Sequence, residues 1–85
     1  MTKHVLLILI GNRKESAVKL QKILSAWGCI IKTRLGIHDG VLEHCSDQGL
    51  LILELHGVKE DMLELSRKIE LLDGVSSQLV ELRIA

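Results

Sequence analysis

The stretch that decides the fold is residues 3–10, KHVLLILI, which ends at Gly11. Its last six residues are all Val, Leu or Ile, and a short apolar run that stops at a glycine is typical of a buried β-strand. Residues 49–56, GLLILELH, repeat the pattern and stop at Gly57. Because successive side chains of a strand point to opposite faces, both segments present apolar residues on two faces. Neither segment has a face suited to water.

Two helices and two further strands are predicted around these segments. Apolar residues at helical spacing predict one helix from the Asn12 region to about Trp27, with Asn12 and Glu15 spaced as in a capping box, and a second helix over residues 58–72. Residues 29–37, CIIKTRLGI, and residues 75–84 alternate in polarity, as half-buried strands do. The polar residues 38–48 are expected to form a hairpin loop.

The order β-α-β-β-α-β predicts an α+β fold, the ferredoxin-like βαββαβ sandwich, as one domain over residues 1–85. In that fold a four-stranded antiparallel sheet carries two helices on one face, and the first and third strands are central. The edge strands are expected to alternate, with Lys32 and Arg34 opposite Ile31 and Leu35, and Glu81 and Arg83 opposite Leu82 and Ile84. Arg34 is expected on the face away from the helices.

Helices can cover only one of the two apolar faces of the central strands. The other face would expose an aliphatic strip on the order of a few hundred Å², about the size at which such patches mark contacts. The sequence therefore predicts a homo-oligomer, a dimer or a tetramer, whose apolar interface has a charged rim. The alternative is a monomer that exposes this apolar surface to solvent.

Composition excludes several classes of function. Lys plus Arg and Asp plus Glu number 11 each, so the chain lacks the basic surplus of a nucleic-acid binder, and it has no Phe or Tyr on which RNA bases would stack. Its longest apolar run is too short to span a membrane. Two cysteines without a Cys-x-x-Cys motif or secretion signal predict a cytoplasmic protein. No catalytic motif is present, and we expect no enzyme activity.

The sequence resembles a family of small ACT-like proteins, the iron-only hydrogenase system regulators. The likeness runs over nearly the whole chain and includes Gly11-Asn12-Arg13, Gly28-Cys29-Ile30-Ile31 followed by Arg34-Leu35-Gly36-Ile37, and Leu72-Asp73-Gly74-Val75. One departure is residues 67–70, RKIE, where the family tends to carry a Gly-Lys-Leu-Gly-like stretch. The resemblance implies a ligand-sensing regulatory oligomer linked to hydrogenase expression or maturation through a protein partner, and kinship to the sensor domain of nickel-responsive regulators.

The predicted ligand site lies at the turn Gly11-Asn12-Arg13. Backbone N–H groups and the helix dipole favour a small anion at a helix N-terminus, and the resemblance implies an amino acid there. Arg34 is expected to pair with Glu54 across the hairpin or to reach a ligand. Gly36 is grouped with this site and is expected to mark a bulge or close packing.

Two alternatives to a small-molecule sensor remain open. His38, His44 and Cys45 have side chains that suit nickel or zinc, which would make the chain a metal sensor or carrier, but their spacing fits no compact site. The other interpretation of these residues is that the histidines are exposed to solvent in the loop and that the cysteine binds no metal. The other alternative is an oligomerisation module without a ligand. Cys29 is expected to start a strand as a small buried residue.

Overall fold

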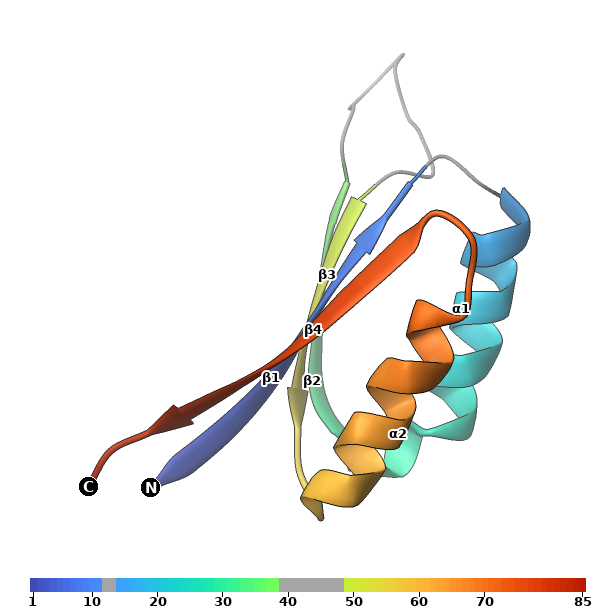
Figure 1. The fold of residues 1–85 in the computed structure, drawn as a ribbon. Helices are drawn as coiled ribbons and strands as arrows, with labels where there is room; N and C mark the ends of the chain where they lie inside the picture. The colour runs from blue at the N-terminus through green and yellow to red at the C-terminus, as the bar shows by residue number, and fades with distance from the viewer. Residues whose placement is uncertain (12–13, 39–48) are drawn as a thin grey trace.

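The computed structural model describes residues 1–11, 14–38 and 49–85. Its elements, in chain order, are β1 (Thr2–Ile10), α1 (Lys14–Ala26), the 3-10 helix η1 (Gly28–Ile30), β2 (Ile31–His38), β3 (Gly49–Leu55), α2 (Lys59–Glu70) and β4 (Val75–Arg83). The antiparallel strands lie in the order β2-β3-β1-β4, and both helices lie on the same side of the sheet (Figure 1). The predicted ferredoxin-like fold is confirmed, with β1 and β3 at its centre.

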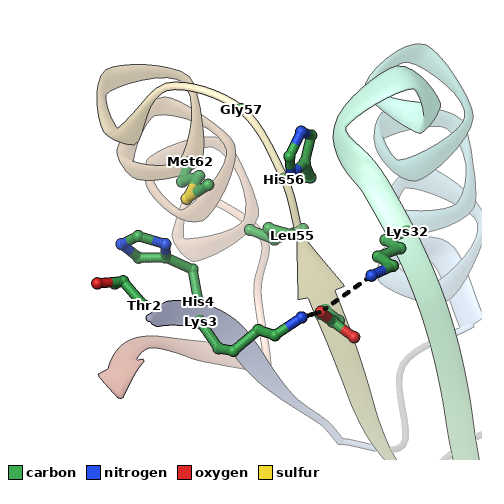
Figure 2. Close-up of a pocket in the computed structure, with 9 residues that line it drawn as sticks. Thr2, Lys3, His4, Lys32, Leu55, His56, Gly57 and Met62 are labelled. Carbon is green, nitrogen blue, oxygen red and sulfur yellow. Dashed lines mark hydrogen bonds and ion pairs between the residues drawn. The ribbon is translucent and has the colours of Figure 1, made fainter. Parts of the chain in front are cut away.

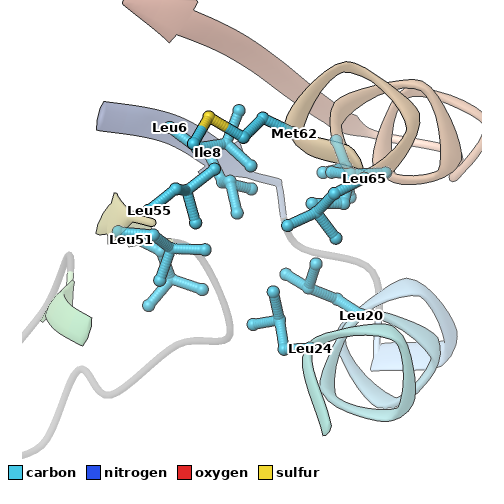
Figure 3. Packing of buried hydrophobic residues seen from close by; sticks show 11 residues of the cluster. Leu6, Ile8, Leu20, Leu24, Leu51, Leu55, Met62 and Leu65 are labelled. Atoms are coloured by element: carbon cyan, nitrogen blue, oxygen red, sulfur yellow. The ribbon is translucent and has the colours of Figure 1, made fainter. Parts of the chain in front are cut away.

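The hydrophobic core lies between the sheet and the two helices. Alternate residues of β1 and β3 point into it, and both helices add side chains at three- and four-residue spacing (Figure 3). The buried apolar residues are Leu6, Ile8, Leu20, Leu24, Leu51, Leu53, Leu55, Met62, Leu65, Ile69 and Val75. Burying one such side chain contributes about 1.5–3 kcal/mol, so this layer is the main source of stability.

The prediction for Cys29 is wrong in both respects. This residue lies in η1 and is exposed. The reason is the length of β3, which ends at Leu55, the residue that pairs with Ile31. Beyond this pair the His56 N–H still donates to the carbonyl oxygen of Ile30, but Ile30 already belongs to η1, so β2 begins at Ile31.

A β-bulge near the start of β2 decides which side chains of this strand face the helices. Ile31 pairs with Leu55, whereas Thr33 pairs with Glu54, so Lys32 is an extra residue in the strand. One extra residue shifts the alternation of side chains. Ile31 therefore faces the core as predicted, but every residue of β2 after the bulge faces the side opposite to the predicted one.

The prediction that Arg34 faces away from the helices is therefore wrong. Arg34 pairs with the buried Leu53, and its Nη2 donates a hydrogen bond of 2.7 Å to Oε1 of Gln21 on α1. Glu54, its predicted partner, lies on the other face. Gly36 pairs with Leu51 on the helix side, where an added Cβ would lie 3.3 Å from Leu51 Cδ2. Gly36 thus marks close packing, and the bulge lies at Lys32.

We call the sheet surface opposite the helices the open face. All four strands contribute aliphatic side chains to it: Val5, Leu7, Leu9, Leu35, Ile37, Leu50, Ile52, Val80 and Leu82. The apolar surface is thus wider than the predicted strip on the two central strands. The charged rim predicted for this surface was to come from the edge-strand residues Lys32, Arg34, Glu81 and Arg83, but Glu81 pairs with His4 in the register of β1 and β4 and so lies on the helix side.

The end of β1 is joined closely to the turn between α2 and β4. The Gly11 N–H donates to the carbonyl oxygen of Gly74 at 2.8 Å, and a Cβ at Gly11 would lie 3.0 Å from that oxygen. The Ser16 hydroxyl, which is buried, donates to the carbonyl oxygen of Asp73 at 2.6 Å. A glycine lets the two backbones approach this closely without displacement, whereas a Cβ here would make a contact tighter than is usual.

We expect Gly11→Ala to destabilise the fold by about 1–3 kcal/mol, because the added methyl group must push the 73–74 turn away and weaken its hydrogen bond. Urea denaturation measures this change. The control is Gly28→Ala, since no described atom lies within 4 Å of a Cβ at Gly28. Equal losses of stability in the two variants would contradict this role of Gly11.

Candidate functional site

A pocket of about 250 Å³ lies where β1 and β3 diverge (Figure 2). Pairing between these strands stops at His4 and Leu55, while β1 continues along β4 to Thr2. On the other side, the His56 N–H donates to the carbonyl oxygen of Ile30, which draws the end of β3 toward η1. The lining residues are Thr2, Lys3, His4, Lys32, Glu54, Leu55, His56, Gly57 and Met62.

Gly57, which lines this pocket, allows the chain to turn out of β3. Its φ of +131° is in a region that residues with a side chain rarely adopt. Two residues later α2 begins at Lys59, and its acidic first turn and basic last turn suit the helix dipole. The glycine therefore lets the chain turn from the end of β3 toward α2 beside this pocket.

Glu54 forms ion pairs with two lysines at the edge of the open face. Its Oε2 lies 3.1 Å from Lys3 Nζ, within hydrogen-bond distance, and 3.8 Å from Lys32 Nζ. The hydrogen bond from Lys3, with smaller contributions from the charges of Lys3, Lys32 and His56, lowers the pKa of the Glu54 carboxyl. Glu54 therefore stays ionised to a lower pH than an ordinary glutamate does.

Glu81 is the second carboxylate at this end of the sheet. His4 Nε2 lies 2.9 Å from its Oε1, Lys59 Nζ lies 3.6 Å from the same oxygen, and Arg83 Nη2 lies 3.4 Å from Oε2. The hydrogen bond with His4 and the charge of Lys59 lower the pKa of Glu81. Counting both clusters, four basic side chains face two carboxylates, so the two ion-pair clusters together carry an excess of positive charge.

The five residues predicted to bind a ligand do not meet in one described site. Gly11 lies at the opposite end of β1 from the pocket, and its N–H is already bonded to Gly74. Asn12 and Arg13 lie outside the described residues. Arg34 and Gly36 lie on the edge strand β2, which β3 separates from β1.

The pocket residues were not predicted as a group, although the sequence holds a signal for them. Each central strand changes from aliphatic to polar at one end, at Lys3 and His4 in one strand and at Glu54 and His56 in the other. Antiparallel pairing places the start of one strand beside the end of its neighbour. The two polar ends must therefore meet.

The candidate metal ligands are not described by the structure. His44 and Cys45 lie outside the described residues, and of His38 only the backbone in β2 is described. Within the described part of the chain, no group of three or more His, Cys, Asp or Glu side chains could hold a metal ion. The metal hypothesis for His38, His44 and Cys45 stays a prediction. None of the described helices is long and apolar enough to cross a membrane.

Comparisons with known proteins bear on the fold. No protein-family model and no curated protein matches the chain. Among solved structures, uncharacterized protein TM1266 from Thermotoga maritima is similar with a TM-score of 0.81 at 21% identity, over 98% of this chain and 100% of that one. CPII from Thiomonas intermedia K12, a nitrogen regulatory PII-like protein, is similar in its apo form with a TM-score of 0.46 at 20% identity, over 98% and 90%. The first likeness shows a shared fold, and the second is too distant to carry an argument.

Replacing Lys3 should shift the titration of Glu54 and leave that of Glu81 unchanged. Because the folded-state pKa of Glu54 is lowered, its carboxylate stabilises the fold above the unfolded-state pKa, and this contribution is lost as the pH falls through the folded-state pKa. Lys3→Met removes the hydrogen bond, so the pKa of Glu54 should rise toward its ordinary value.

The measurement is a pH titration of the glutamate carboxyl carbons by NMR, with Glu81 as the internal control because Lys3 is not among its partners. Stability measured by urea denaturation should also depend less on pH across the acidic range in Lys3→Met. An unchanged titration of Glu54 in this variant would refute the assigned cause.

Proposed function

We propose that this chain is a non-enzymatic, ligand-sensing regulatory domain that works in the cytoplasm as a homo-oligomer. The open face is the assembly surface, and its aliphatic composition is the observation that carries the proposal. Leu9 and Leu35 are each more than half exposed in the single chain, and Leu7, Leu50 and Ile52 lie between them half-buried. An interface core of this kind, with Lys3, Lys32 and Glu54 at its border, matches the apolar centre and polar rim of stable protein contacts.

The size of the open face is sufficient for a stable contact. Four strands about 4.8 Å apart and about seven residues long at about 3.3 Å per residue cover roughly 400 Å² in plan. Two copies placed face to face would therefore bury on the order of 1,000 Å² of accessible surface, about the minimum for a specific interface. Burial of this apolar area is the driving force that we assign to assembly.

The sensing role is supported by the polar pocket at the end of the open face. Lys3, Lys32 and Glu54 line the pocket and also border the face, so a ligand there would lie beside the contact between copies. The link to iron-only hydrogenase expression or maturation is supported by the sequence resemblance to the regulator family. In this role the domain would act on a regulatory or maturation protein partner.

A lysine on the open face should separate the copies. In sedimentation velocity experiments we expect the wild-type chain to exceed its monomer mass of 9.5 kDa, and Leu9→Lys to weaken association at least tenfold, or by about 1.4 kcal/mol, because the charge would be buried between apolar surfaces. Val18→Lys is the matched control, because Val18 lies on α1 and both side chains are 57% exposed.

A wild-type chain that sediments as a monomer at high concentration would overturn the assembly proposal. The same would follow if Leu9→Lys and Val18→Lys assembled equally well. Circular dichroism of both variants verifies that the fold is retained.

The regulatory role has a separate test in an organism that makes an iron-only hydrogenase. Deletion of the gene for this chain is expected to change the amount of hydrogenase mRNA or of active hydrogenase. Expression of the wild-type chain should restore the original level, whereas Leu9→Lys should not. Unchanged hydrogenase mRNA and activity after deletion would refute the link.

A further inference from the structure

Lys32 is the less engaged of the two lysines beside Glu54. Its Nζ lies 3.8 Å from the carboxylate, beyond the range of about 2.7–3.2 Å for an N–H···O hydrogen bond, whereas Lys3 Nζ lies at 3.1 Å. The Lys32 side chain is 58% exposed, and its ammonium group has three N–H donors. Lys32 can therefore hydrogen-bond a second anion without removing the hydrogen bond that Lys3 gives to Glu54.

His56 is a second donor on the same flank of the pocket. Figure 2 shows Lys32 and His56 on one flank, with His4 and Met62 on the other. Among the described residues, the His56 ring makes no hydrogen bond, and the ring is close enough to Glu54 for its charge to influence the pKa of that carboxyl. A histidine ring can donate from at least one nitrogen whatever its charge.

Charge and size restrict what the pocket can hold. It contains two ammonium groups and one carboxylate, so one positive charge is left without a counterion. The volume of about 250 Å³ lies below the range of roughly 300–1,000 Å³ that is typical of ligand pockets. The pocket lining also has no arginine, the side chain that binds phosphate through two parallel hydrogen bonds. These features favour a compact anion with one negative charge.

We propose that this pocket binds a small organic carboxylate between Lys32 Nζ and the His56 ring, while Lys3 stays on Glu54. The site lies at the end of β1 opposite Gly11, so it is distinct from the ligand site that the sequence predicts around that residue. The inference deepens the sensing role proposed above and rests on it, since it assigns the ligand class and the two groups that hold it.

The test is an NMR titration of the full chain with sodium acetate, in which chloride is exchanged for acetate at constant ionic strength. We expect saturable shifts at the His56 ring and the amide of Lys32. Lys32→Gln should raise the dissociation constant about tenfold, as expected for the loss of one charge-assisted hydrogen bond. Lys22→Gln is the control, because Lys22 is an exposed lysine on α1 with no ion pair among the described residues. It should bind acetate as the wild type does.

Two further titrations distinguish sources of the carboxylate. Glycine binding more tightly than acetate would identify an amino acid, and the reverse would identify a simple acid. Inorganic phosphate binding without acetate binding would overturn the assigned class, as would an absence of saturable shifts or equal affinities in Lys32→Gln and Lys22→Gln. Sedimentation of the same samples separates the two proposals, because an oligomer that binds no acetate refutes the site alone.

Discussion

Two helices cover one face of the four-stranded sheet, while the strands carry aliphatic side chains on both faces. The covered face accounts for the core, in which Leu6, Leu53 and Leu65 are fully buried. The open face holds residues of the same kind, including Leu7 and Ile52, with no described element against them. The core explains how a single chain of this length folds, and the open face is the reason to expect that it does not act alone.

Much of the fold was predictable because its signals are local. The six aliphatic residues 5–10, the glycines that end segments and the helical spacing of Leu20, Leu24 and Leu65 gave the element order and the central strands. The facing of β2 was not predictable, since Ile31, Leu35 and Ile37 would share one face of a regular strand and no residue type marks Lys32 as an extra residue. A bulge depends on how the partner strand pairs, which is information held elsewhere in the chain.

The candidate site, too, could be predicted from the sequence only in part. The pocket joins the start of β1 to the end of β3, so it follows from pairing rather than from any motif, and reading Lys3 and His4 beside Glu54 and His56 would have located it. Gly11 shows the opposite case. A glycine before a helix suggests a ligand turn, yet here the residue is required where two backbones approach, at Gly74. A pattern of residue types cannot distinguish these two uses of a glycine.

The bulge at Lys32 also bears on how this surface can change in evolution. Deleting the codon of Lys32 would restore regular pairing between β2 and β3, and every later residue of β2 would keep its partner and its face. If Lys32 instead stayed and paired with Glu54 in a regular ladder, Arg34 would lie opposite Ile52 and Leu35 opposite Leu51. That slip in register would place a charge within the aliphatic open face without changing the sequence. The open face therefore tolerates the loss of the extra residue, whereas a substitution that removes the bulge by a slip in register would disrupt it.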